Sequence, residues 1–117
     1  MTAKYPVSGG DARDILVATE GTPAAPAGGN IYCLKLQPYG VTTWTLQAGF
    51  PAGTSFRAIK AAPAYAGDFT FIAVGAQAAG TVAVLGVRDI NANTTTYNTS
   101  TAFPLTITAT ATIGNLV

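Results

Sequence analysis

The chain has 117 residues, which is enough for one domain with a substantial core, and only 9% of them are charged. Ordinary soluble domains carry roughly 25% charged residues. The net charge of +1 and the scattering of the basic residues argue against binding to nucleic acid or to an anionic membrane, because both need clustered Lys and Arg.

The N-terminal part divides into an arm and the start of a domain. We expect residues 1–14 to form a flexible arm and residues 15–117 to form one domain. A first strand is predicted within residues 11–20, around the apolar run ILVA, with a short helix from Asp11 as the weaker alternative. The N-terminus lacks the apolar core of a signal peptide, so we expect a protein made in a cytoplasm, although a severed ectodomain with an added Met stays open.

The next three predicted strands are separated by turns rich in Gly and Pro. Residues 21–29 (GTPAAPAGG) are a loop, because proline lacks the N–H that a ladder needs. Residues 30–36 and 55–61 both alternate as strands do. Residues 41–48 contain the single tryptophan of the sequence, and we expect Trp44 and Leu46 to point inward and Gln47 outward.

The strand expected at residues 67–75 (GDFTFIAVG) has an unusual second face. Phe69 and Phe71 should lie in the core, yet the opposite face carries Ile72 and Val74, where a solvated strand would be polar. Residues 81–89 are also apolar on both faces. We therefore predict that one set of apolar side chains contacts another protein chain: Ile72, Val74, Leu85 and Val87.

The C-terminal part continues the β pattern. Residues 90–100 are an Asn/Thr tract expected to form a long hairpin, and residues 105–113 alternate strictly, with Leu105 and Ile107 on the face assigned to the core. The apolar run at 69–87 has the length of a membrane helix, but it contains polar residues and three glycines, and it fits two strands better. No segment has a helical period. About seven or eight short antiparallel strands predict an all-β fold, a β-sandwich or small barrel.

Chemical motifs are few. The sequence contains no histidine and a single cysteine, Cys33, which excludes histidine-based triads and an internal disulfide. The carboxylate pair Asp11 and Asp14 is expected on a solvated surface. Asp89 begins a partial calcium-loop pattern, but Thr94 replaces the required glycine, so a turn is expected. We therefore predict no enzyme activity, no metal site and no cofactor.

Three segments resemble bacterial immunoglobulin-like (cadherin-like) domains. They are residues 43–56 (TWTLQAGFPAGTSF), residues 63–74 (PAYAGDFTFIAV) and residues 103–108 (FPLTIT), in the order of that family. The resemblance implies an immunoglobulin-like β-sandwich in which Trp44 is the core tryptophan, packed by Phe69, Phe71 and Leu105. The chain departs from the family at Ile72 and Val74, where Thr or Ser is usual, which suggests an interface peculiar to this protein.

The family's domains are adhesive or spacer modules in surface proteins and in tailed-phage virions. The resemblance and the missing leader together predict a structural module of a phage particle, a capsid decoration (cement) or tail accessory protein. Its partners would be sister subunits or a capsid or tail protein, in an oligomer or lattice. The alternative is a carbohydrate- or host-binding adhesin that uses loop tyrosines: Tyr39, Tyr65 and Tyr97.

Overall fold

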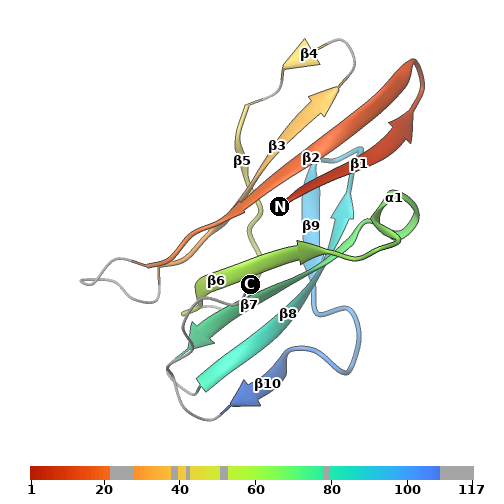
Figure 1. Ribbon diagram of the computed structural model, residues 1–117. Helices are drawn as coiled ribbons and strands as arrows, with labels where there is room; N and C mark the ends of the chain where they lie inside the picture. Colours follow the sequence, from red (N-terminus) through yellow and green to blue (C-terminus); the bar gives the residue numbers. More distant parts are fainter. Residues whose placement is uncertain (22–27, 38–39, 42, 51–52, 78–79, 109–117) are drawn as a thin grey trace.

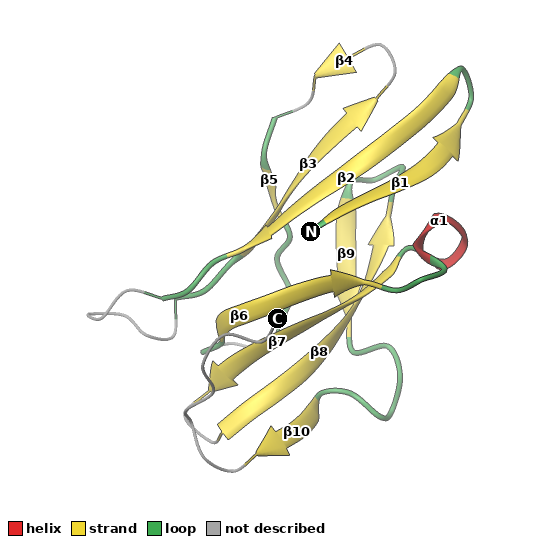
Figure 2. Ribbon diagram, in the orientation of Figure 1, coloured by secondary structure: helices red, strands yellow, loops and turns green. Residues whose placement is uncertain are grey.

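The protein is nearly all β and consists of two antiparallel sheets packed face to face (Figures 1 and 2). A computed structural model describes residues 1–21, 28–37, 40–41, 43–50, 53–77 and 80–108. The prediction of an all-β sandwich is confirmed. No helix in the described ranges is long and apolar enough to cross a membrane.

Each sheet is built from one half of the chain. The first sheet contains β1 (Thr2–Val7), β2 (Gly10–Ala18), β3 (Ile31–Gln37), β4 (Gly40–Val41) and β5 (Thr45–Leu46). The second contains β6 (Ser55–Ala61), β7 (Thr70–Gln77), β8 (Gly80–Asp89), β9 (Thr94–Tyr97) and β10 (Leu105–Thr108), with the short helix α1 (Tyr65–Asp68) between β6 and β7.

The order of strands in both sheets follows the chain. Neighbouring strands pair as β1-β2-β3 in the first sheet and as β6-β7-β8 in the second. The last strand of each series then pairs with two short strands on its other side: β3 pairs with β4 and β5, and β8 pairs with β9 and β10. The described chain thus passes between the sheets once, from β5 to β6. In immunoglobulin domains the chain passes between the sheets repeatedly. The sandwich here is a pair of meanders.

The first fourteen residues are ordered strands, so the prediction of a flexible arm is wrong. They form β1 and the beginning of β2, paired from Thr2 opposite Ile15 to Val7 opposite Gly10. The side chain of Tyr5 points into the core and is 1% exposed. Pro6 takes an outward position within the alternation of β1, and proline is tolerated there because β1 is an edge strand.

The core lies between the sheets and draws apolar side chains from both. Phe71 is fully buried, as predicted, and its ring packs edge-on against Tyr97 at a centroid distance of 6.2 Å. Gly86 lies opposite Phe71 in the register of β7 and β8, and a Cβ there would come within 2.3 Å of the ring. Phe69 is partly buried and packs edge-on against Tyr5.

Four side chains that were assigned to the core are exposed instead: Trp44 by 50%, Leu46 by 47%, Leu105 by 54% and Ile107 by 49%. The face of β5 is inverted relative to the prediction, because Gln47 points inward and is 1% exposed. The strand β10 pairs with β8 along one edge only among the described residues, so it is open to solvent.

Candidate functional site

The outer face of the second sheet is apolar, and it brings together the four residues predicted to contact another chain. Ile72 lies opposite Leu85 in the register of β7 and β8, and Val74 and Val87 point to the same side. Ile72 is 42% exposed, and the other three are half-buried. Leu105 extends this surface, because it pairs with Ala83. We call this surface the β7–β8 face.

The outer face of the first sheet is also apolar, which the sequence analysis missed. Val17 lies opposite Tyr32, and Tyr32 lies opposite Leu46. We call this surface the β2–β3 face; its apolar side chains are Ile15, Val17, Tyr32, Leu34, Leu36, Leu46 and Trp44. An open hollow of about 300 Å³ on this face is lined by Val17, Tyr32 and Trp44.

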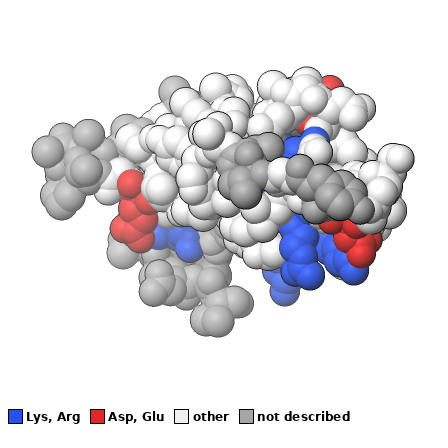
Figure 3. Space-filling view, turned by 90° about the horizontal axis from the view of Figure 1, so that it is seen from above, with Lys and Arg blue, Asp and Glu red and all other residues white. Residues whose placement is uncertain are grey.

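Charged side chains lie at the margins of these faces. Seen from above, much of the described surface is uncharged, and the charged side chains are gathered in a few groups (Figure 3). Lys4 forms an exposed ion pair of 2.7 Å with Asp11, and Arg13 follows on the same outward side of β2. An apolar centre with a polar rim is the usual anatomy of a protein–protein interface.

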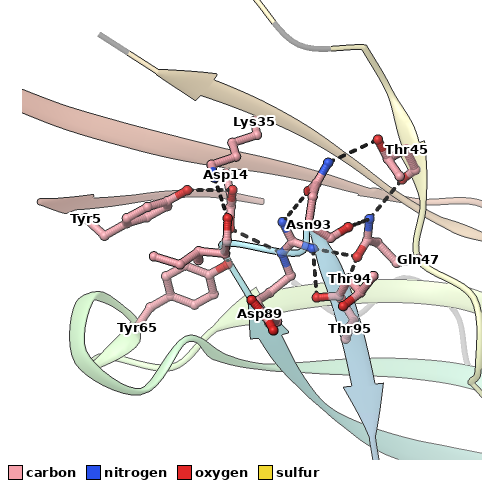
Figure 4. A network of polar contacts seen from close by, with 12 residues as sticks. Tyr5, Asp14, Lys35, Thr45, Gln47, Tyr65, Asp89, Asn93, Thr94 and Thr95 are labelled. Carbon is pink, nitrogen blue, oxygen red and sulfur yellow. Dashed lines mark hydrogen bonds and ion pairs between the residues drawn. The ribbon is translucent and has the colours of Figure 1, made fainter. Parts of the chain in front are cut away.

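A buried polar cluster fastens the two sheets together (Figure 4). Asp14, on β2, has a fully buried carboxylate that accepts hydrogen bonds from the Tyr5 hydroxyl at 3.1 Å and the Tyr65 hydroxyl at 2.7 Å. Its Oδ2 also lies 3.2 Å from Nε of Arg88, on β8. The expectation of a solvated surface is therefore wrong for Asp14, whereas Asp11 is exposed.

The guanidinium of Arg88 is satisfied by groups from both halves of the chain. Its Nη1 donates to Oε1 of Gln47 at 2.5 Å and to the carbonyl oxygen of Thr94 at 3.0 Å, and its Nη2 donates to Oδ1 of Asn93 at 2.7 Å. The hydroxyl of Thr95 also donates to Oε1 of Gln47, at 2.8 Å. The side chain of Gln47 points inward because its Oε1 accepts both of these hydrogen bonds in the core.

The tyrosine and cysteine side chains around this cluster are held in their neutral forms. Burial, reinforced by the negative charge of Asp14, raises the pKa of Tyr5 and of Tyr65 above the ordinary tyrosine value. Burial also raises the pKa of the Cys33 thiol to about 12. The carboxylate of Asp14 and the guanidinium of Arg88 form an ion pair with each other. The arrangement suits a structural fastening of the sheets.

The remaining sequence motifs have structural explanations. The carboxylate of Asp89 accepts the backbone N–H groups of Asn91 and Ala92, both at 2.9 Å, which confirms the predicted turn. No group of three or more acidic or cysteine side chains that could hold a metal ion occurs in the described ranges.

The tyrosines predicted to bind a ligand from exposed loops mostly form hydrogen bonds within the protein. Tyr65 is 3% exposed and bonded to Asp14, so its assignment to an exposed binding loop is wrong. Tyr97 is half-buried, and its hydroxyl donates to the carbonyl oxygen of Gln47 at 3.0 Å. Tyr39 lies outside the described residues.

Comparison with known proteins gave no match. No family model fits the chain, and neither a curated protein nor a solved structure is similar to it. The resemblance to immunoglobulin-like domains stays a prediction. The features of this fold that bear on its function are the two apolar outer faces and the buried cluster between the sheets.

Proposed function

We propose that this protein is a non-enzymatic structural module that binds other protein subunits through its β7–β8 face. The observation that carries this proposal is the outward position of Ile72, Val74, Leu85 and Val87 on neighbouring strands. A continuous apolar face of a sheet is costly to leave in water, and such surfaces commonly mark sites of protein contact.

The size of the apolar contribution favours a repeated assembly. Complete burial of an exposed aliphatic side chain stabilises a complex by about 1.5–3 kcal/mol. Three of the four side chains are already half-buried, so the face would contribute roughly 3–6 kcal/mol. Association costs an estimated 4–15 kcal/mol, so one such contact is weak. Many equivalent contacts in a lattice would hold firmly, because each bound copy positions the next.

The setting that we propose is the particle of a tailed phage, where the protein would be a capsid decoration or tail accessory component. This part of the proposal is supported by the resemblance in sequence to domains found in such virions, although the strand order differs from that of immunoglobulin domains, and by the low charge of the chain. Its partners would be a shell or tail protein, sister copies, or both.

The test is a co-sedimentation experiment with the shell or tail proteins encoded beside this gene. We expect the wild type and the control Ala66→Asp, an exposed position in α1 outside the apolar side chains of both faces, to sediment with the particles. Ile72→Asp should remain a folded protein in the supernatant, because it would bury a charge in the contact. Sedimentation of Ile72→Asp at the wild-type level would refute the proposal.

The alternative function, a glycan-binding adhesin, is not favoured by the described residues, because the hydroxyls of Tyr65 and Tyr97 bond within the protein. A broad glycan array separates the two functions, since specific binding of one glycan class would favour the adhesin.

A further inference from the structure

Both sides of the sandwich are apolar on the outside. The buried side chains of the two sheets meet in a common core, so the β2–β3 face and the β7–β8 face point in opposite directions. Val17 and Trp44 on one side are as exposed as Ile72 and Leu105 on the other, between 42% and 54%. One partner on the β7–β8 face would leave the opposite side uncovered.

We propose that the β2–β3 face of one copy packs against the β7–β8 face of the next copy. The inference rests on the proposed function for the β7–β8 face and adds a binding role for the opposite face. Each such contact leaves one free face at either end, so the copies would form rows, or rings if the rotation between them closes. Two sheets packed in this way lie about 10 Å apart, as in the interior of a sandwich.

The charges at the margins favour contact between unlike faces. On the first sheet, Lys4, Asp11 and Arg13 point outward in register, which gives that margin a net charge of +1. On the second sheet, Lys60 lies opposite Ile72. Asp89 follows Val87 on the outward side of β8, and Asp68 bonds to Thr70 at the beginning of β7.

The margin of the second sheet therefore has a net charge of −1, from Lys60 against Asp68 and Asp89, because Arg57 on β6 is neutralised by its ion pair with Glu20. Packing either face against its own kind would bring together margins of the same net charge, whereas packing one face on the other brings together margins of opposite net charge. These exposed charges would select the orientation of the contact more than they strengthen it.

The shape of the β2–β3 face also fits such a partner. The hollow lined by Val17, Tyr32 and Trp44 is shallow and open. Ile72 and Leu105 stand out from the β7–β8 face and are the side chains suited to enter it. Tryptophan and tyrosine are enriched at the energetic centres of protein interfaces, where partner side chains fill small pockets.

A mixing experiment tests the proposal, because a contact between unlike faces can be restored by two defective copies. Val17→Asp blocks the β2–β3 face, and Ile72→Asp blocks the β7–β8 face. We expect each variant alone to sediment as a monomer, while the wild type and Ala66→Asp form larger species. An equimolar mixture of the two variants should form a dimer with one copy of each, since one intact face of each kind remains.

Three results would overturn the inference: a mixture that stays monomeric, a single variant that still forms a dimer with itself, or a wild type that is monomeric at every concentration. Circular dichroism confirms the folding of each variant, and Trp44→Asp replaces Val17→Asp if the latter is misfolded. A monomeric wild type, together with loss of shell binding by Ile72→Asp, would reject this inference and leave the proposed function standing. A mixed dimer together with normal shell binding by Ile72→Asp would reject the proposed function instead.

Discussion

At the scale of single residues, Arg88 and Asp14 are the pair on which the arrangement of the sheets depends. Their side chains are fully buried, and they join β8 in one sheet to β2 in the other. A buried ion pair adds little stability over an apolar pair of the same size, but removing one partner leaves an uncompensated charge. The hydrogen bonds that the Arg88 guanidinium donates also fix the positions of Gln47 and Asn93.

We therefore expect Arg88→Met to lower the free energy of unfolding by about 3–5 kcal/mol, because the buried Asp14 carboxylate would lose its ion pair with Arg88. Urea unfolding followed by circular dichroism measures this loss. The matched control is Lys60→Met, an exposed position on the same sheet, which should change stability by no more than about 0.5 kcal/mol. Equal effects of the two substitutions would show that the buried pair has no special role.

Sequence reasoning at this scale failed where polar contacts link distant parts of the chain. Asp14 and Arg88 are 74 positions apart, and Arg88 and Gln47 are 41 positions apart. No local pattern reveals that such residues meet. The one available signal was the placement of a charge within strands that are otherwise apolar, as at Arg88 in β8. A buried charge needs a partner, so that placement could have prompted a search for one.

At the scale of elements, alternation predicted the long strands well and the short ones poorly. In β7 the inward position of Phe71 and the outward position of Ile72 follow directly from the period of two. The two-residue strand β5 carries too little alternation to fix its face. Its orientation is set by the contact between Gln47 and Arg88, which turns Trp44 and Leu46 outward.

The pairing of β7 with β8 depends on the absence of a side chain at Gly86. A methyl group there would meet the ring of Phe71, and the ring is fully buried and cannot move freely. We expect Gly86→Ala to lower the free energy of unfolding by about 1–3 kcal/mol through overpacking. The comparison is Gly67→Ala in α1, where a Cβ meets nothing within 4 Å and little loss is expected. Both changes can be followed by thermal unfolding, and equal stability of the two variants would contradict the packing argument.

At the scale of the whole molecule, the excess of apolar strand surface was visible in the sequence, but its distribution was not. The β7–β8 face was expected from the apolar residues on both sides of two strands. The β2–β3 face was missed, because Trp44 and Leu46 were assigned to the core and so did not count as surface. The division of the chain into two meanders depends on which strands pair, and that pairing is decided by tertiary packing.

The most direct test of outward apolar faces is the fluorescence of Trp44, the only tryptophan in the sequence. In dilute solution we expect red-shifted emission that is strongly quenched by acrylamide, because half of the side chain is exposed. With rising protein concentration the emission should shift to the blue and lose its quenching, and Ile72→Asp should abolish this change. Blue-shifted, unquenched emission at every concentration, in wild type and variant alike, would place Trp44 in the core and contradict the account.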